Sequence, residues 1–226
     1  METAKYVTFE GPDGSGKTTQ IRLVKECLDK FNLPLALVRE PGGTPLAETL
    51  RNLLLSPEQA PINGRPEILT GVSELFIFLS ARAQLFEYVI LPRLASGINI
   101  LGDRGRDSTR AYQGAGRFKD DPRMLERIDD LNDVATQNRQ PDLTIIFDLP
   151  VEMIFERIHA RGEKELASFE KTCQADFYQR VREQFLAIAQ REPNRIIVID
   201  GSLSVERVFE QIRPHIDELF GLNRTS

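Results

Sequence analysis

The residues with the clearest chemical potential lie near the N-terminus, in the run Gly11-Pro12-Asp13-Gly14-Ser15-Gly16-Lys17-Thr18. This run matches the pattern G-x-x-x-x-G-K-[ST] at every fixed position. Glycines in this arrangement let backbone N–H groups close around phosphate oxygens, and the following helix adds about half a positive charge at its start. Lys17 adds a full positive charge, and the Thr18 hydroxyl is suited to holding Mg²⁺. The run therefore predicts a phosphate-binding loop.

The segments on either side of this run support that interpretation. Residues 5–9 predict a short strand, and residues 19–31 have the spacing of an amphipathic helix, with Ile21, Val24 and Leu28 on one face. A strand, the loop and then a helix is the setting in which this motif binds phosphate. We therefore prefer a phosphate-binding loop to a glycine-rich surface turn.

Short apolar segments alternate with amphipathic stretches along all 226 residues. Five of the apolar segments predict β-strands, at residues 5–9, 35–38, 98–101, 143–147 and 196–199. Strands that are separated by helices form parallel sheets covered on both faces. We therefore expect a single α/β domain over residues 1–226.

The connecting segments differ in character. Residues 67–95 predict one long helix, whereas residues 60–66, rich in Pro, Gly and Asn, predict a loop. The segment 103–117 is polar and rich in Gly and Arg, and residues 107–114 within it are expected to be rich in turns. A charged break at residues 161–168 separates two helical patterns, which is typical of a mobile segment. We place a lid at residues 161–170.

Composition argues against several classes of function. A net charge of −5 and a pI near 5.3 disfavour a nucleic-acid-binding surface. Cys27 and Cys173 are too few for a disulfide framework, so we expect free thiols in the reducing cytoplasm. Neither His159 nor His215 has the neighbours of a zinc site. No apolar run approaches the ~20 residues that span a bilayer, so we expect no membrane contact.

Further polar residues follow the predicted strands or lie on helices. Asp103 and Arg104 come directly after the third strand, where a carboxylate can hold Mg²⁺ and a guanidinium can bind phosphate. Phe78 and Arg82 lie four residues apart, so they share one helix face. A ring that stacks on a base beside a guanidinium that donates to its carbonyl edge suits a pyrimidine. Asp148 also ends a strand, and we interpret it as structural.

These features together favour a small kinase. The sequence has no Asn-Lys-x-Asp motif of GTP-binding switches, and the chain is too short for a large motor ATPase. The residues 107–114 add hydroxyl, phenol and amide groups close to Arg104. We expect a second site beside the phosphate-binding loop, for an acceptor that is itself a phosphate ester.

The sequence resembles the bacterial thymidylate kinases (dTMP kinases). The matching segments follow the family's order and are residues 9–19, 39–51, 78–84, 103–117, 141–150 and 199–202. The resemblance implies a P-loop nucleoside-monophosphate-kinase fold, with a five-stranded parallel sheet in the order 2-3-1-4-5, flanking helices and a lid. It also implies transfer of the γ-phosphoryl group of Mg-ATP to dTMP, giving dTDP and ADP, by a homodimer.

The same resemblance implies the site residues. The ATP-binding residues are Gly11, Pro12, Asp13, Gly14, Ser15, Gly16, Lys17, Thr18, Thr19, Asp200, Ser202 and Leu203. The dTMP-binding residues are Asp13, Arg51, Phe78, Arg82, Arg104, Thr109, Tyr112 and Gln113. The metal-binding residues are Thr18 and Asp103, and the catalytic residues are Lys17, Arg104, Asp103, Asp13, Arg161 and Arg157.

Individual roles follow from the family's pattern. Asp13 matches the carboxylate that meets the 3′-hydroxyl of the deoxyribose, and Arg51 and Arg104 match the arginines around the dTMP phosphate. Phe78 matches the residue that stacks on thymine, and Arg82 matches the one that donates to its carbonyl. The resemblance further implies that Thr109 and Gln113 meet the base edge and that Tyr112 crowds the sugar 2′ position.

The chain departs from the family's pattern at two places. Gly105 stands where an aromatic residue or histidine usually follows Asp-Arg, and Ala167-Ser168 replaces an Asp-Arg pair in the lid. Because the phosphate-binding loop has no arginine, the family pattern assigns the transition-state cation to the lid, and we favour Arg161, then Arg157. A kinase of other nucleoside monophosphates is the alternative, and an inactive nucleotide-binding regulatory protein is a more distant one.

Overall fold

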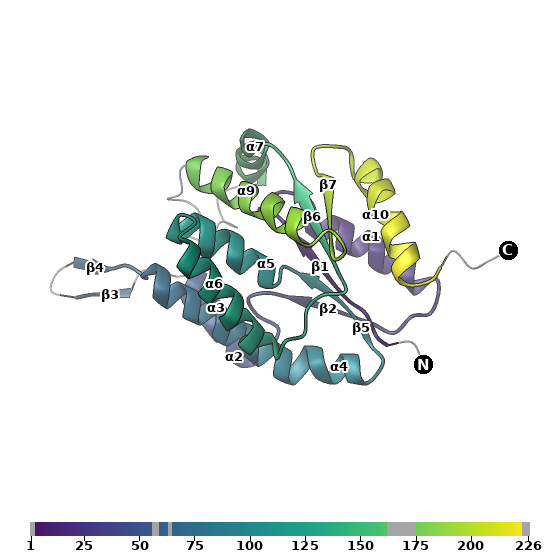
Figure 1. The fold of residues 1–226 in the computed structure, drawn as a ribbon, viewed down its shortest axis with the longest axis horizontal. Helices are drawn as coiled ribbons and strands as arrows, with labels where there is room; N and C mark the ends of the chain where they lie inside the picture. The colour runs from purple at the N-terminus through teal and green to yellow at the C-terminus, as the bar shows by residue number, and fades with distance from the viewer. Residues whose placement is uncertain (1–2, 56–58, 63–64, 162–174, 223–226) are drawn as a thin grey trace.

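The computed structural model describes residues 3–55, 59–62, 65–161 and 175–222. Its main sheet consists of the strands β1 (Tyr6–Glu10), β2 (Leu35–Arg39), β5 (Asn99–Asp103), β6 (Leu143–Asp148) and β7 (Ile196–Asp200). The strands are all parallel, in the spatial order β2-β5-β1-β6-β7 (Figure 1). Counted along the chain, this is the expected order 2-3-1-4-5, so the predicted fold is confirmed.

Helices cover both faces of this sheet (Figure 1). The described helical elements are α1 (Lys17–Asp29), α2 (Pro45–Leu55), α3 (Gly71–Leu85), η1 (Phe86–Ile90), α4 (Leu91–Ala95), α5 (Arg106–Thr109), η2 (Arg110–Arg117), α6 (Pro122–Thr136), α7 (Val151–Arg161), α9 (Ala175–Arg191) and α10 (Val205–Leu219). Side chains alternate between the faces of β6: Ile145 and Phe147 pack in the core with α1 and α10, and Ile146 packs with η2 and α9. This alternation explains why every strand at the centre of the sheet is apolar.

The strand register brings the predicted polar residues to one edge. Phe9 of β1 pairs with Asp103 of β5, and Arg39 of β2 pairs with the same Asp103. Because the strands are parallel, the loops that follow β1, β2 and β5 leave the sheet side by side. The phosphate-binding loop, the segment after Arg39 and Arg104 are therefore neighbours in space.

Residues 107–114 differ from the turn-rich expectation. They lie in helix α5 and in the wide helical turns of η2, which follows α5 directly. An added Cβ at Gly114 would lie 2.5 Å from Leu125 Cδ2, and one at Gly116 would lie 2.4 Å from Phe177 Cε2. The glycines that suggested turns are thus places where α6 and α9 pack closely against a helix, which short-range patterns do not reveal.

The expected loop at residues 60–66 also differs. Residues Gln59–Ile62 (β3) and Arg65–Glu67 (β4) form a two-stranded antiparallel sheet. The two strands are separated in the sequence by Asn-Gly, a pair that favours β-hairpins. The long helix that we expected from residue 67 begins later, at Gly71, where the Thr70 side chain accepts a hydrogen bond from Ser73 N.

The continuous helical segment Gly71–Ala95 corrects one expectation. It has 25 residues and is long and apolar enough, by length and composition, to cross a membrane. The expectation that no apolar run approaches that length is therefore wrong. Within the fold, α3 packs against α2 and α6 and buries Leu75, Leu79 and Leu85, as a core helix does.

Candidate active site

The phosphate-binding loop connects β1 to α1. Gly11, Gly14 and Gly16 have φ angles of 135°, 79° and 96°, which glycine adopts without a steric penalty. Gly11 also needs to lack a side chain, because a Cβ there would lie 2.9 Å from Phe147 O of β6. Lys17 is buried, and its Nζ donates to Gly11 O at 3.0 Å and to Pro12 O at 2.8 Å. Burial, followed by the charge of Arg104, lowers the pKa of Lys17 to about 8.

A candidate Mg²⁺ site lies beside this loop. Thr18 Oγ1 donates to Asp103 Oδ2 at 3.3 Å, which places a hydroxyl and a carboxylate together at the start of α1. Within the described parts of the chain, no group of three or more His, Cys, Asp or Glu side chains could hold a metal. Mg²⁺ in nucleotide enzymes is usually held by one or two protein oxygens, substrate phosphates and water. The pair therefore fits that ion when phosphates are bound next to it.

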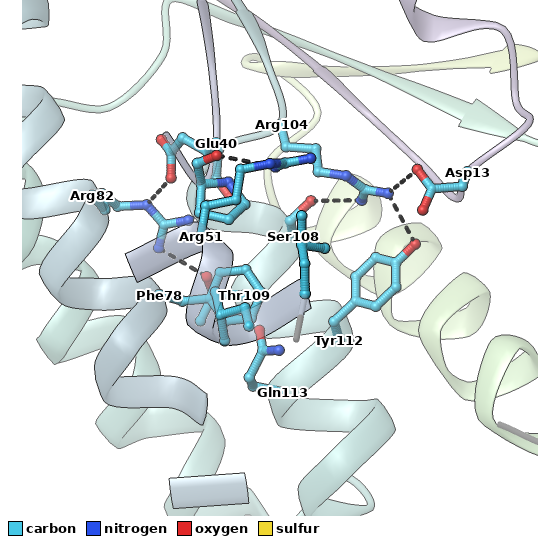
Figure 2. Close-up of a pocket in the computed structure, with 14 residues that line it drawn as sticks. Asp13, Glu40, Arg51, Phe78, Arg82, Arg104, Ser108, Thr109, Tyr112 and Gln113 are labelled. Atoms are coloured by element: carbon cyan, nitrogen blue, oxygen red, sulfur yellow. Dashed lines mark hydrogen bonds and ion pairs between the residues drawn. The ribbon is translucent and has the colours of Figure 1, made fainter. Parts of the chain in front are cut away.

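Two cavities meet at the edge of the sheet. The first is lined by the phosphate-binding loop and its neighbours, namely Asp13, Gly14, Gly16, Lys17, Thr18, Arg39, Glu40, Arg51, Asp103 and Arg104. The second, shown in Figure 2, has an open volume of about 730 Å³ and is lined by residues of α2, α3, α5 and η2. Asp13, Glu40, Arg51 and Arg104 line both cavities. A ligand in one cavity is thus next to a ligand in the other.

The structure brings all the residues expected to bind dTMP to the second cavity. They are Asp13, Arg51, Phe78, Arg82, Arg104, Thr109, Tyr112 and Gln113. Leu54, Leu55, Pro41, Gly105, Ser108 and Glu40 complete the lining. The cavity combines an aromatic ring and aliphatic side chains with a few fixed polar groups, which is the usual composition of a small-molecule site.

Arg104 stands between the two cavities. Its Nη2 donates to Asp13 Oδ1 at 2.8 Å and to Tyr112 Oη at 3.4 Å, and its Nη1 donates to Ser108 Oγ at 3.3 Å (Figure 2). Its φ angle of 69° lies in the left-handed region, a conformation that costs a non-glycine residue about 1–3 kcal/mol. The contacts with Asp13, Ser108 and Tyr112 hold this side chain where it can meet phosphates from both sides.

Glu10 supports Arg104 indirectly, through Ser108, and this role was not expected from the sequence. It is fully buried at the end of β1, where its carboxyl group accepts from the backbone N of Ser108 at 3.3 Å and from Ser108 Oγ. Burial and the nearby charge of Asp107 raise the pKa of Glu10 to about 8. The chain of contacts Glu10–Ser108–Arg104 connects the central strand to the site. The sequence signal that could have identified Glu10 is a charged residue at the end of an apolar strand.

Arg82 is a buried and fixed donor, not a surface arginine. Its Nε donates to Glu40 Oε2 at 2.7 Å, Nη1 to Thr109 Oγ1 at 2.8 Å and to Asn132 Oδ1, and Nη2 to Gly105 O at 2.9 Å. A guanidinium has five N–H donors, so these contacts among the described residues leave one on Nη2 for a ligand. Glu40 and Asn132 were not predicted, because they meet Arg82 only through the fold.

Gly105 lies against the sheet. A Cβ at this position would be 3.0 Å from Thr8 Cγ2 and 3.5 Å from both Glu10 Oε1 and Tyr6 Oη. Its φ of −166° is ordinary extended backbone, so the reason for glycine here is space. A side chain at this position would crowd Thr8 of β1, the strand that also carries Glu10.

The remaining predicted ATP-binding residues lie at the end of β7. Asp200 Oδ1 accepts from Ser202 N at 2.9 Å, and Leu203 is exposed. Asp200, Ser202 and Leu203 line neither cavity, although the neighbouring Gly201 approaches Ser15 of the phosphate-binding loop. Gly11, Pro12, Ser15 and Thr19 line neither of the two cavities.

Helix α7 carries the two candidate lid arginines. Arg157 Nη1 donates to Gly201 O at 2.9 Å and to Gly14 O at 3.4 Å, so it bridges the end of β7 and the phosphate-binding loop. Arg161 is the last residue of α7, and the rest of the predicted lid lies outside the described residues. Asp148 forms an ion pair with Arg182 of α9 at 2.6 Å, which agrees with a structural role.

Comparison with known proteins identifies the family. The family model described as "Thymidylate kinase" matches residues 9–212. A thymidylate kinase of Pseudomonas fluorescens is 41% identical over 96% of this chain and 97% of its own length, and one of Kosmotoga olearia is 38% identical over 92% of each. A crystal structure of thymidylate kinase from Ehrlichia chaffeensis superposes with a TM-score of 0.72 at 33% identity, covering 96% of this chain and 99% of that one. This chain, with its phosphate-binding loop and adjoining second cavity, belongs to the thymidylate kinase family.

Proposed function

We propose that this protein transfers the γ-phosphoryl group of Mg-ATP to dTMP, giving dTDP and ADP. The observation that carries the proposal is the pair of adjoining cavities, one around the phosphate-binding loop and one around Phe78 and Arg82. Asp13, Arg51 and Arg104 stand at their junction, where an acceptor phosphate would face the terminal phosphate of ATP. Membership of the thymidylate kinase family supports the same activity.

The site favours a direct, in-line transfer. The acceptor phosphate is already an anion and hardly needs a general base, so catalysis depends on positioning and on stabilisation of charge. Lys17 would bind the ATP phosphates, and Arg51 and Arg104 would hold the dTMP phosphate next to them. Thr18 and Asp103 would hold the Mg²⁺ that accompanies ATP, an ion that neutralises charge on the phosphates.

The second cavity has the features that a thymidine nucleotide requires. Phe78 offers a ring face for the base, and the remaining N–H of Arg82 can donate to a carbonyl oxygen of thymine. Tyr112 packs beside Arg104, whose guanidinium carbon lies 5.0 Å from the centre of its ring. Following the family resemblance, we assign Tyr112 to the 2′ side of the sugar and Asp13 to the 3′-hydroxyl.

An acceptor panel tests the proposal. Purified protein with Mg·ATP is offered dTMP, dUMP, dCMP, dGMP and UMP in turn, and ADP release is measured. We expect dTMP to have the highest kcat/KM, and we expect turnover to disappear in Lys17→Ala and on chelation of Mg²⁺. Better turnover of another monophosphate would contradict the substrate assignment, and normal activity of Lys17→Ala would contradict the enzyme assignment.

The lowered pKa of Lys17 predicts a pH dependence of ATP binding. Below pH 8 the lysine is charged in the free protein, whereas above pH 8 it is increasingly neutral and must take up a proton to bind phosphates. The Kd for ATP should therefore rise about fivefold between pH 8 and pH 9. The accompanying proton uptake should be measurable by calorimetry in two buffers of different ionisation enthalpy.

The control for this prediction is Lys17→Arg, because a guanidinium stays charged throughout this range. The control is needed because Glu10 also has a pKa of about 8, and its ionisation would weaken ATP binding in the same direction. A pH-dependent Kd that persists unchanged in Lys17→Arg would show that Lys17 is not responsible.

The two arginines of α7 are expected to act differently. Arginines that stabilise phosphoryl transfer contribute about 10³–10⁵ in rate, so we expect Arg161→Ala to lower kcat at least about a hundredfold with little change in the KM for dTMP. Arg157 holds the carbonyls of Gly14 and Gly201, so we expect Arg157→Ala mainly to raise the KM for ATP. Steady-state kinetics distinguish the two. A decrease in kcat of less than about threefold for Arg161→Ala would refute its assignment.

An exposed apolar surface supports the proposal of a homodimer. Leu46 and Leu53 of α2 and Val72 and Phe76 of α3 are each 42–53% exposed, and the two helices pack side by side. Exposed apolar side chains gathered on two neighbouring helices are typical of association sites. A single domain and a cytoplasmic location complete the proposal, and the buried free thiol of Cys27 suits a reducing compartment.

The dimer is tested with Phe76→Glu. A charge placed in an apolar interface should produce a monomer by sedimentation, whereas Val205→Glu on α10, at a similarly exposed valine, should leave the oligomeric state unchanged. A wild-type protein that sediments as a monomer would contradict the proposal.

A further inference from the structure

Glu74 is a buried carboxylate directly behind the second cavity. It lies in the first turn of α3, is 2% exposed and does not line the cavity itself. Arg117 of η2 donates to it from Nε at 3.2 Å to both oxygens, and its Nη2 lies 3.0 Å from Oε2. A buried charged group of this kind needs partners, and Arg117 provides the opposite charge.

The second partner of Glu74 is Gln113, a residue of the cavity wall. Gln113 Nε2 donates to Glu74 Oε1 at 2.7 Å, and Gln113 is also 2% exposed. An ionised carboxylate only accepts hydrogen bonds, so only the NH₂ of the amide can face it. The amide oxygen of Gln113 must then lie on the other side, and in Figure 2 it is directed toward Thr109 and Phe78.

The backbone of Gln113 is held as firmly as its side chain. The next residue, Gly114, packs under Leu125 of α6, and Gly116 packs under the ring of Phe177 of α9, with no space for a Cβ at either position. The guanidinium of Arg117 lies over the same Phe177 ring, 5.5 Å from its centre. The amide oxygen is thus presented to the cavity from a fixed position.

Arg82 and Gln113 together present one donor and one acceptor. Thymine has a carbonyl oxygen at C4 and an N–H at N3, which complement an N–H donor and a C=O acceptor. Cytosine has the reverse pattern, with an amino group at C4 and an unprotonated N3. A Gln113 amide turned by 180° would present its NH₂ instead, which matches N3 of cytosine and opposes N3–H of thymine.

We propose that Glu74 is a positioning residue for base selection, which fixes the amide of Gln113 so that its oxygen faces the base and cytosine is rejected. This inference rests on the proposed function, because it assumes that the second cavity binds dTMP. Glu74 acts only through Gln113, and Arg117 holds the carboxylate of Glu74 in place by donating to both of its oxygens.

The test is Glu74→Gln, a nearly isosteric change. A glutamine at this position can donate as well as accept, so the Gln113 amide is free to take both orientations. We expect the ratio of kcat/KM for dTMP to that for dCMP to decrease at least about tenfold. The ratio for dTMP to dUMP should change by less than about twofold, because both bases have the same N3–H and C4 carbonyl.

Arg117→Lys is the matched control, since it keeps both the carboxylate and a positive partner. It should keep the dTMP-to-dCMP ratio within about threefold of the wild type. Three results would each overturn the proposal. The first is an unchanged dTMP-to-dCMP ratio in Glu74→Gln, and the second is an equal change in its dTMP-to-dCMP and dTMP-to-dUMP ratios. The third is an equal decrease of the dTMP-to-dCMP ratio in Glu74→Gln and Arg117→Lys. The wild-type acceptor panel tests the proposed function separately, because it does not involve Glu74.

A measurement on the wild type covers the case in which Glu74→Gln fails to fold. The side-chain ¹⁵N resonance of Gln113 can be assigned by its loss in Gln113→Leu. We expect one of its NH₂ protons to exchange slowly with solvent, both without ligand and with dTMP bound, because it is bonded to Glu74. Rapid exchange of both protons in either state would contradict the proposed orientation.

Discussion

The register between β1 and β5 is the constraint on which the rest of the site depends. Phe9 pairs with Asp103, so the phosphate-binding loop leaves β1 at the level where Asp103 and Arg104 leave β5. This places Thr18 within hydrogen-bond distance of Asp103 and Arg104 within reach of Asp13. A shift by one residue would exchange the side chains of the strand between two covered faces and disrupt the packing of both, so the same apolar packing that stabilises the sheet also sets the geometry of the site.

Buried charge is the second theme of the structure. Lys17, Glu10, Glu40 and Arg82 are all buried at the sheet edge, where an unpaired charge would be strongly destabilising. Glu40 and Arg82 form an ion pair, Lys17 donates to the carbonyls of Gly11 and Pro12, and Glu10 accepts from Ser108. Burial explains the shifted pKa values of Lys17 and Glu10, both about 8. Glu40 Oε1 has no hydrogen-bond partner among the described residues, which is consistent with a polar site that a ligand completes.

Much of the fold followed from the sequence, because its signals are local. The loop motif and the apolar strands were predicted correctly from such signals. The strand order and the residues expected around dTMP came from the family resemblance; the order is confirmed, and those residues line one cavity. The residues that support this cavity were not predicted, because they contact it from distant parts of the chain. Glu10 contacts Ser108, Glu40 contacts Arg82, and Glu74 contacts Gln113. Helix η2 was missed for the same reason, since its glycines serve packing against α6 and α9.

The sequence by itself determined the chemistry available: a loop that binds phosphates, arginines for an acceptor anion, and an aromatic ring beside a guanidinium. Those properties depend on residue type and short spacing, which the chain carries in any conformation. Only the tertiary structure decided how these side chains are oriented. The remaining N–H of Arg82 and the oxygen of Gln113 are left for the cavity, because their other hydrogen bonds go to Glu40 and Glu74, up to 42 residues away in the chain.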